Sequence, residues 1–279
     1  MKVIIYGAGQ TGERIYQELQ SFIGVQVVAF ADRNPTYWEG ELFGLKIINP
    51  NEINSREYDK VVVATMAYEG AVENLVQDFS VPKEKIDISY VFESIKNRII
   101  FLEYFSKLVY DRNITGNVAE GGVFDGAFAK KINEFFPDRT LYLFDTFEGF
   151  DSRDIGAEIK NKFSKYGVGH LKTSEEKVKQ ILPHPEKAII KKGYFPETAA
   201  GIDDKFVFVN LDFDLYAPTL AGLDFFYPKM VHGGVILVHD YFTPGYKGVK
   251  KAVDEFCENN KIAFMPIADE ISIAIVKQN

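Results

Sequence analysis

The strongest constraint on the fold is a series of short apolar, β-prone runs separated by segments with helical spacing. In residues 1–90 these are Lys2–Tyr6 (strand), Glu13–Phe22 (helix), Val25–Ala31 (strand), Lys60–Thr65 (strand) and Glu69–Phe79 (helix). A strand–helix–strand series builds a parallel sheet with right-handed crossovers. The first part of the chain is therefore expected to form a small α/β domain.

The series stops between Val91 and Tyr110, where apolar residues recur every three or four positions. This spacing predicts a long amphipathic helix that connects two domains. The series then restarts with Asn117–Ala119, Ala127–Phe135 (helix), Leu141–Phe144, Ala188–Lys191, Phe206–Leu211, Thr219–Tyr227 (helix), Val235–Val238, Gly248–Asn259 (helix) and Ile271–Val276. We expect two tandem Rossmann-type α/β domains, residues 1–92 and 93–279. The polar segment Asp151–Glu175 is expected to form a lid over a substrate.

Charge and cysteine content limit the partners and the compartment. The formal net charge is −8, which argues against a nucleic-acid or anionic-membrane surface, because such a surface needs a basic face. No apolar run approaches the ~20 residues of a membrane-spanning helix. Cys257 is the single cysteine, and Met1 leads directly into a strand-like run without a signal peptide. These features predict a soluble, cytoplasmic protein.

The turn after the first strand has the spacing of a dinucleotide-binding fingerprint. Gly7, Gly9 and Gly12 form GxGxxG, and Asp32 ends the second strand. This is a second candidate nucleotide site, for NAD(P). A hydride-transfer partner is missing from this part of the sequence, since the first histidine is His170.

A second glycine-rich turn opens the second series. Glu120, Gly122 and Gly126 lie in VAEGGVFDGAFA, and Asp145 ends the next strand. Both positions meet at the carboxyl edge of a doubly wound sheet, where an acid can accept hydrogen bonds from a ribose diol. This arrangement suits an adenosine-containing ligand, either NAD or S-adenosylmethionine, and the looser turn favours S-adenosylmethionine. The alternative role of Asp145 is to cap the following helix.

Acidic residues follow two further strands. Asp212 and Asp214 end one run, and His239 and Asp240 end the next. These side chains are expected to converge, and oxygen-rich clusters suit Mg²⁺ or Mn²⁺. The alternative is that they are helix caps and loop acids, with His239 a hydrogen-bonded structural residue.

Several ordered motifs resemble the macrocin O-methyltransferase family of sugar O-methyltransferases. They cover about residues 115–279 and read VAEGGVFDGAFA, LYLFDTFEGF, GYFPET, FVNLDFDLYAPTL, YPKMVHGGVILVHDY and KKAVDEF. The resemblance implies a class I methyltransferase-like domain that moves a methyl group from S-adenosylmethionine to a hydroxyl of a sugar-containing small molecule or glycan, assisted by a metal. The residues that it implies for cofactor binding are Glu120, Gly121, Gly122, Gly126, Asp145, Thr146, Phe147 and Gly193.

The same resemblance implies a metal site formed by Asp212 or Asp214 together with His239 and Asp240. The family usually shows two acids before the tyrosine of its last motif, whereas His239 takes the first place here. Histidine is a softer ligand, so Mn²⁺ or a weaker Mg²⁺ site is expected. Asp212 by preference, or His239, would take the proton of the sugar hydroxyl.

Two other functions compete with methyl transfer. The first domain could make the protein an NAD-dependent oxidoreductase that acts on a nucleotide sugar. Alternatively, it could be a docking or oligomerisation module that delivers a carrier-linked sugar. We also expect a homo-oligomer.

Overall fold

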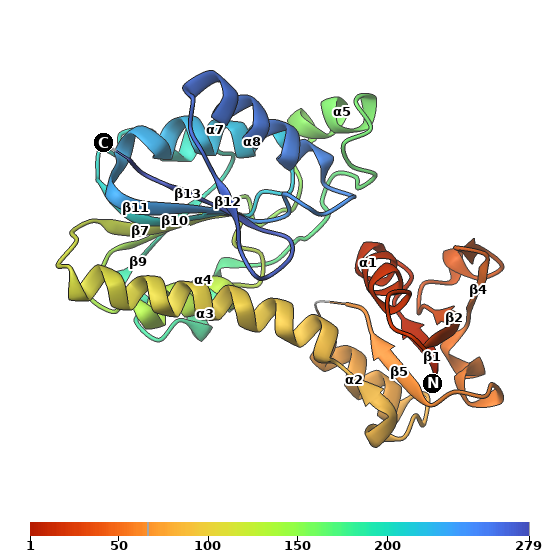
Figure 1. Ribbon diagram of the computed structural model, residues 1–279. Helices are drawn as coiled ribbons and strands as arrows, with labels where there is room; N and C mark the ends of the chain where they lie inside the picture. Colours follow the sequence, from red (N-terminus) through yellow and green to blue (C-terminus); the bar gives the residue numbers. More distant parts are fainter. Residues whose placement is uncertain (66, 279) are drawn as a thin grey trace. The chain divides into compact units, whose positions relative to one another are not determined.

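The computed structural model describes residues 1–65 and 67–278 (Figure 1). The chain divides into two compact units, unit 1 (Met1–Lys96) and unit 2 (Asn97–Asn279). Each is an α/β unit built around one predominantly parallel sheet. The division falls within the helix α3 (Ser89–Asp111), which begins in unit 1 and ends in unit 2.

Unit 1 contains a six-stranded sheet with the order β3-β4-β2-β1-β5-β6. Its elements are β1 (Lys2–Tyr6), α1 (Gln10–Leu19), β2 (Gln26–Ala31), β3 (Glu41–Leu42), β4 (Leu45–Ile48), β5 (Lys60–Val63), α2 (Tyr68–Gln77) and β6 (Ile86–Asp87). Residues alternate between the two faces of β1, so that Ile5 packs in the cluster with α1 and Ile4 packs in the cluster with α2. The two helices therefore cover opposite faces of the sheet.

Unit 2 contains a seven-stranded sheet with the order β12-β13-β11-β10-β7-β8-β9. Its strands are β7 (Asn117–Gly121), β8 (Leu141–Asp145), β9 (Ala188–Lys192), β10 (Phe206–Leu211), β11 (Met230–Val238), β12 (Met265–Pro266) and β13 (Ile273–Val276). Strands β7 to β11 pair in parallel, whereas β13 pairs antiparallel with β11.

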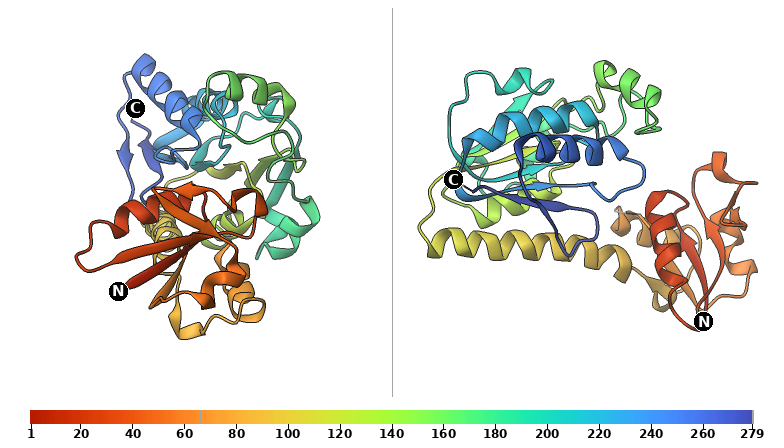
Figure 2. Two further views of the ribbon diagram at one scale, coloured as in Figure 1. Left: turned by 90° about the vertical axis from the view of Figure 1, so that its right-hand side faces the viewer. Right: turned by 45° about the horizontal axis from the view of Figure 1, so that its top comes forward.

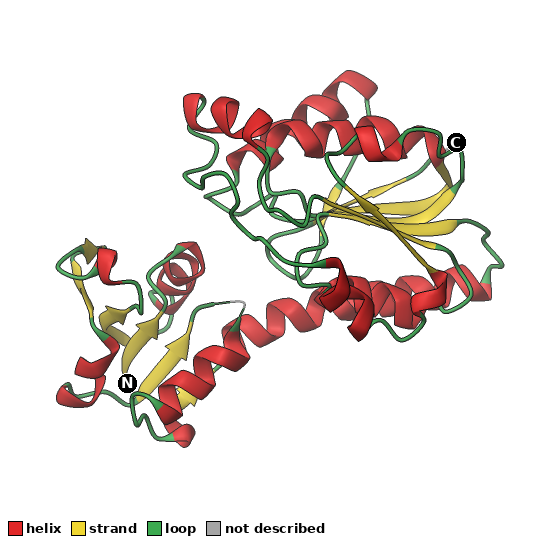
Figure 3. Ribbon diagram, turned by 180° about the vertical axis from the view of Figure 1, so that it is seen from behind, coloured by secondary structure: helices red, strands yellow, loops and turns green. Residues whose placement is uncertain are grey.

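Helices cover both faces of the unit 2 sheet (Figures 2 and 3). They are the second part of α3, α4 (Ala127–Phe135), α5 (Ser152–Lys160), α6 (Glu175–Ile181), α7 (Tyr216–Phe226) and α8 (Lys247–Asn260). The clusters around Leu102 and Ile132 place α3 and α4 on one face, and those around Phe226 and Val253 place α7 and α8 on the other (Figure 1). Strand order reverses between β7 and β10, which opens a crevice at their carboxyl ends.

The element order agrees with the sequence pattern, but several boundaries differ. Helix α1 starts at Gln10 and ends at Leu19, so Phe22, which was expected to be its last residue, lies beyond it and is 49% exposed. Strand β11 starts at Met230, five residues earlier than expected, because Met230 already pairs with Phe206. The short strands β3, β4, β6 and β12 carry too little periodicity to be predicted. The expected lid contains α5.

Candidate active site

A cleft lies at the carboxyl ends of the central strands of unit 2. Clefts at this edge of an α/β sheet are common small-molecule sites. The switch point between β7 and β10 explains its position, because the chain leaves these strands toward opposite faces. The residues that line it are Gly122, Phe124, Asp145, Thr146, Gly149, Phe150, Asp151, Asp154, His170, Leu171, Gly193, Tyr194, Phe195, Asp212, Phe213, Asp214, Leu215 and Pro218.

The glycines of the turn after β7 are required mainly by neighbouring protein atoms. A Cβ atom on Gly121 would lie 2.3 Å from the ring of Phe213, and one on Gly122 would lie 2.0 Å from the Asp212 carbonyl oxygen. Gly126 caps α4 with a φ of 82° and faces the side chains of Val178 and Ile181. The turn therefore lets β10 and α6 pack closely against β7 and α4, which is sufficient to explain its three glycines.

Asp145 organises the turns on both sides of the cleft. Its Oδ2 accepts hydrogen bonds from the backbone N–H groups of Val123 (2.7 Å) and Phe124 (3.0 Å), and its Oδ1 accepts one from Phe147 (2.6 Å). A carboxylate has about four acceptor positions. One position on Oδ1 therefore stays open, enough for one ribose hydroxyl but not for both hydroxyls of a diol.

Four of the predicted cofactor-binding residues line the cleft, namely Gly122, Asp145, Thr146 and Gly193. The side chain of Thr146 donates a hydrogen bond to the Gly149 carbonyl (2.7 Å). Gly193 has a φ of 134°, and its N–H donates to the Asp145 carbonyl. Phe147 and Glu120, by contrast, are not among the residues that line the cleft. Phe147 is 1% exposed in the core beside α4, and Glu120 is buried in β7.

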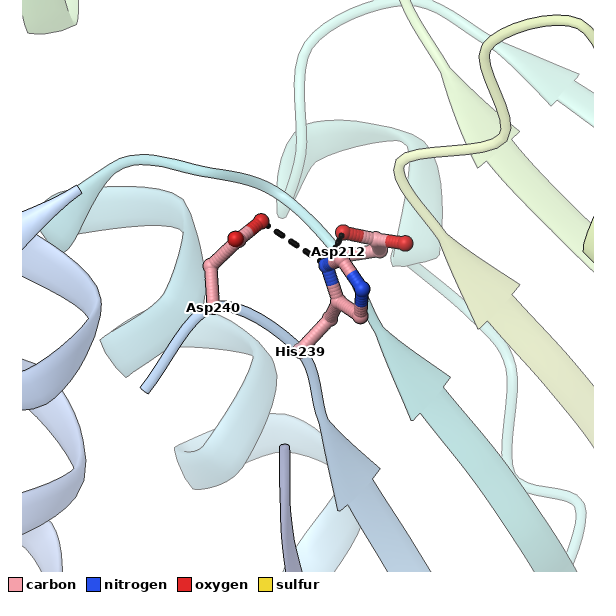
Figure 4. Close-up of side chains that lie close together, drawn as sticks. All are labelled: Asp212, His239 and Asp240. Atoms are coloured by element: carbon pink, nitrogen blue, oxygen red, sulfur yellow. Dashed lines mark hydrogen bonds and ion pairs between the residues drawn. The ribbon is translucent and has the colours of Figure 1, made fainter. Parts of the chain in front are cut away.

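The predicted acidic cluster does assemble (Figure 4). His239 Nδ1 lies 3.0 Å from Asp212 Oδ1 and 2.8 Å from Asp240 Oδ2. Asp212 follows β10, and His239 and Asp240 follow β11, so the parallel pairing of these strands brings the three side chains together. Asp214 lies in the adjoining turn with a positive φ of 63° and lines the cleft.

Burial and mutual contact shift the pKa values of this cluster. Burial and the Arg98 guanidinium by themselves lower the pKa of His239, but the carboxylates of Asp212 and Asp240 raise it to about 10. Burial raises the pKa of Asp212, but His239 and Arg98 lower it by more, so the net shift is downward. Burial and the Asp240 carboxylate raise the pKa of Asp214 well above its usual range. The cluster thus holds an imidazolium between two carboxylates, beside Asp214, whose carboxyl group holds its proton more tightly than an exposed aspartate does.

Arg98 is a site residue that sequence reasoning missed. This α3 side chain donates to Asn210 Oδ1 (2.9 Å) and to Asp212 Oδ2 (2.9 Å), and its guanidinium stacks on the Phe128 ring. Asn210 in turn donates to Glu120 Oε1 (2.8 Å). A sequence signal existed, because Arg98 follows Ile95 and precedes Leu102 at helical spacing and so interrupts the apolar face of a helix.

The cleft's outer wall is formed in part by α5. Asp154 is 5% exposed and accepts a hydrogen bond from the Tyr194 hydroxyl (2.8 Å). One turn later Glu158, 1% exposed, accepts from the backbone N–H of Tyr216 at the start of α7 (2.7 Å). Arg153 stacks on Tyr194 at 3.5 Å. The expected lid is thus attached to the wall by buried polar contacts.

The donor set of the cluster fits a small divalent cation. One ligand atom from each of Asp212, His239 and Asp240 lies within 4.8 Å of the others. Adjacent ligands of an octahedral Mg²⁺ ion with bonds of 2.0–2.1 Å are about 2.9 Å apart. The observed separations from Nδ1 are close to this value. A cation is not required to neutralise the acids, because Arg98 and His239 already pair with them.

In unit 1, the residues of the second predicted nucleotide site also lie at one edge of the sheet. Gly7 and Gly9 lie between β1 and α1, Gly12 lies in the first turn of α1, and Asp32 follows β2, which pairs with β1. The Ala8 N–H donates to Asp32 Oδ2 (2.8 Å). Within residues 1–65 and 67–278, no helix combines the length and apolar character required to span a bilayer.

Two family models match the chain. Residues 90–274 match the model described as Macrocin-O-methyltransferase (TylF), and residues 1–87 match the model described as C2185-like, N-terminal. The first match covers more than half of the chain. The second match coincides closely with unit 1.

Two curated relatives have names that refer to O-methylation. Demethyldecarbamoylnovobiocin O-methyltransferase of Streptomyces niveus is 30% identical over 178 residues, which cover 58% of this chain and 64% of the relative. Mycinamicin III 3''-O-methyltransferase of Micromonospora griseorubida is 25% identical over 179 residues, which cover 54% and 63%. The chain spans less than two thirds of the length of both relatives.

Solved structures show a related fold. The O-methyltransferase NovP aligns with a TM-score of 0.53 and 25% identity, covering 66% of this chain and 80% of NovP. CalS11, a calicheamicin methyltransferase, aligns with a TM-score of 0.57 and 16% identity, covering 75% and 91%.

Proposed function

The chain belongs to the macrocin O-methyltransferase family, and from this premise we propose that unit 2 transfers a methyl group from S-adenosylmethionine to a hydroxyl group of a sugar-containing acceptor. The observation that carries the proposal is the joint position of the cleft and the Asp212–His239–Asp240 cluster at the carboxyl ends of β10 and β11. Two relatives named as O-methyltransferases of novobiocin-type and mycinamicin substrates support a sugar-bearing acceptor.

The methyl donor would lie in the cleft beside Asp145. One ribose hydroxyl would donate to the open acceptor position on Asp145 Oδ1, and Gly122 and Gly193 would line the path of the ligand. The cleft walls would hold the sulfonium methyl group and the acceptor oxygen in line, which converts a bimolecular displacement into a positioned one. Phe124 and Phe195 add apolar surface to the wall and exclude water from the sulfonium.

Asp212, His239 and Asp240 would hold a divalent cation, which when bound lowers the pKa of a coordinated hydroxyl. The acceptor's proton would pass to Asp212, whose low pKa makes it a weak base that relies on the lowered pKa of a coordinated hydroxyl. With a pKa of about 10, His239 is already protonated near neutral pH between the two carboxylates and cannot accept this proton. It becomes a ligand only when a cation displaces the Nδ1 proton.

Calorimetry and mass spectrometry test the proposal. S-adenosylmethionine should bind the full-length protein, and a screen of sugar-containing acceptors should detect the gain of one methyl group. Asp240→Asn should reduce the turnover number by about 100-fold or more, the loss expected when a charged group at the reacting centre is removed. Asp203→Asn is the matched control, because Asp203 has a 98% exposed side chain. Equal activity of the two variants would remove the cluster from the mechanism.

Chelation separates the two roles of His239, which are cation ligand and charged partner of Asp212 and Asp240. If the enzyme loses activity in a chelator and regains it with Mn²⁺ or Mg²⁺, His239 is a ligand and Asp212 is the base that the sequence favoured. If the chelated enzyme keeps its activity, the cation is not required and His239 remains the charged partner of the base Asp212. Absence of S-adenosylmethionine binding would reject methyl transfer itself.

A further inference from the structure

The three glycines of the GxGxxG pattern in unit 1, Gly7, Gly9 and Gly12, differ in what the fold requires of them. A Cβ atom on Gly7, whose φ is 121°, would lie 2.6 Å from the Ala64 carbonyl oxygen. A Cβ atom on Gly12 would lie 2.1 Å from the Gly7 carbonyl oxygen. Close packing between β1, β5 and α1 therefore excludes a side chain at both positions.

Gly9 has no such reason to be glycine. A Cβ atom there would meet no described atom within 4 Å, and its φ of −86° is open to any L-residue. Gly9 is the N-cap of α1 and provides no side-chain cap, so no side chain of the N-cap residue covers the start of the helix. The missing side chain leaves room for a ligand to approach the backbone.

An open cleft lies beside this turn, at the carboxyl ends of β1 and β5. Strand order reverses between these strands, with α1 on one face of the sheet and α2 on the other. Gly70 of α2 lines the cleft, and a Cβ atom there would also meet no described atom within 4 Å. Glycine within a helix costs about 0.5–1 kcal/mol relative to alanine, and Gly70, like Gly9, has no packing reason to be glycine.

The wall of the cleft contains an unsatisfied polar group. Tyr6 lines the cleft and is 4% exposed, and its hydroxyl has no hydrogen-bond partner among the described residues. Burial raises the pKa of Tyr6 to about 12, which keeps the hydroxyl protonated as a donor. A buried hydroxyl without a partner is unfavourable, and an acceptor oxygen of a ligand would satisfy it.

Two charged residues, Asp32 and Arg33, line the same cleft. Asp32 Oδ2 accepts the Ala8 N–H and Oδ1 accepts the Asn34 N–H, both at 2.8 Å. One acceptor position therefore stays open on each oxygen, which is enough for both hydroxyls of a ribose. The equivalent Asp145 in unit 2 has only one open position. Arg33 is exposed and suits a phosphate group.

We propose that unit 1 binds a nucleoside diphosphate group, with its ribose at Asp32 and its diphosphate at the N-terminus of α1 beside Gly9. The ligand is either a nicotinamide dinucleotide or a nucleotide-linked sugar, since both contain this group. The site is separate in sequence from the methyl-transfer cluster of unit 2. Its function is binding, and it needs no reacting side chain from unit 1.

The test is calorimetry of the full-length protein with NAD⁺, NADP⁺ and UDP-glucose. At least one of these probes should bind, and its identity distinguishes the dinucleotide from the nucleotide sugar. Gly9→Ala should raise Kd about tenfold or more, since one methyl group at the phosphate position blocks close approach. Tyr6→Phe should also raise Kd, by about five- to tenfold, while leaving the melting temperature unchanged or higher, because it removes an unsatisfied buried hydroxyl.

Gly156→Ala is the matched control, because Gly156 lies in α5 of unit 2 and its Cβ atom would also meet nothing within 4 Å. It should leave nucleotide binding unchanged. S-adenosylmethionine binding should be equal in wild type, Gly9→Ala and Tyr6→Phe, which keeps this proposal independent of methyl transfer. The proposal is overturned if none of the three probes binds at millimolar concentration, or if Gly9→Ala binds as tightly as wild type.

Discussion

At the scale of single residues, Asp32 and Asp145 show how one sequence position serves two kinds of site. Each lies at the carboxyl end of the second strand of its unit, and each accepts a backbone N–H group from the preceding glycine-rich turn. The difference is the number of acceptor positions that remain, two on Asp32 and one on Asp145. An acid at this position therefore holds the turn in both units, and its capacity for a ligand depends on how many N–H groups the turn presents.

The charge of His239 predicts a pH dependence of stability. Its pKa is about 10 in the folded protein and near 6.5 when exposed. A raised pKa means that the contribution to stability is complete below about pH 6.5 and is lost as the pH rises toward 10. In the presence of a chelator, the urea midpoint of the wild type should therefore fall across this range. His239→Gln should show a flatter profile, and parallel profiles would contradict the assigned charge.

Arg98 is expected to stabilise unit 2 through Asp212 and Asn210. Arg98→Met removes the positive partner of a largely buried carboxylate, so we expect a loss of about 2–4 kcal/mol in unfolding free energy, slightly less than for a fully buried pair. Arg98→Lys should lose less, since it keeps the charge. Arg153→Met is the control, because Arg153 also contacts carboxylates but has a 48% exposed side chain. Denaturant unfolding should rank the three variants in this order, and an equal loss for Arg98→Met and Arg153→Met would be inconsistent with it.

At the scale of elements, α5 shows how a polar segment becomes part of a wall. Its sequence is polar enough to be interpreted as a loose lid, yet Asp154 and Glu158 lie one turn apart and both are buried. They bind Tyr194 and the first N–H group of α7. The helix is thereby tied to two neighbouring segments of unit 2, and its opening would have to break both contacts.

Glu158 gives an element-scale prediction with a defined sign. Burial raises its pKa, so the unfolded chain loses this proton at a lower pH than the folded protein. The folded state is therefore penalised increasingly as the pH rises above about 4.3, the usual glutamate value. Glu158→Gln keeps an acceptor for Tyr216 and should melt at a higher temperature than wild type at pH 7, with the gain shrinking toward pH 4. Glu158→Ala leaves that N–H without its acceptor and should cost about 1–3 kcal/mol.

At the scale of the whole molecule, each unit has its own core, its own sheet and its own cleft at a reversal of strand order. The family match for residues 90–274 assigns the methyltransferase relationship to unit 2, and a separate model describes residues 1–87. One chain could therefore bind two different ligands at two separate sites. An oxidoreductase reaction in unit 1 is not needed to explain its glycine-rich turn.

Hydrogen exchange with mass spectrometry tests this division. S-adenosylmethionine should slow amide exchange around Gly122, Asp145 and Gly193, since ligand binding stabilises the segments that contact it. It should leave the turn at Gly7–Gly12 unchanged. A nucleotide that binds unit 1 should give the reverse pattern. Protection of the Gly7–Gly12 turn by S-adenosylmethionine alone would show that the donor site has been assigned to the wrong unit.

The sequence by itself determined the architecture and the edge at which the candidate sites lie. Continuous apolar runs with helical segments between them define buried parallel strands, and the carboxyl ends of such strands meet at one edge. For that reason Asp212, His239 and Asp240 could be placed together, and Asp145 at the same edge of the sheet. The macrocin O-methyltransferase relationship was also visible in the order of the motifs.

Only the tertiary structure decided which side chains pair. Arg98 lies 114 residues from Asp212, and the ring of Phe213 occupies the space left open by Gly121. It also separated Gly9, which no protein atom constrains, from Gly7 and Gly12, which the packing requires. Local periodicity identifies the buried face of an element but not the atoms that the other elements bring to it. Hydrogen-bond partners, pKa shifts and open acceptor positions depend on those atoms.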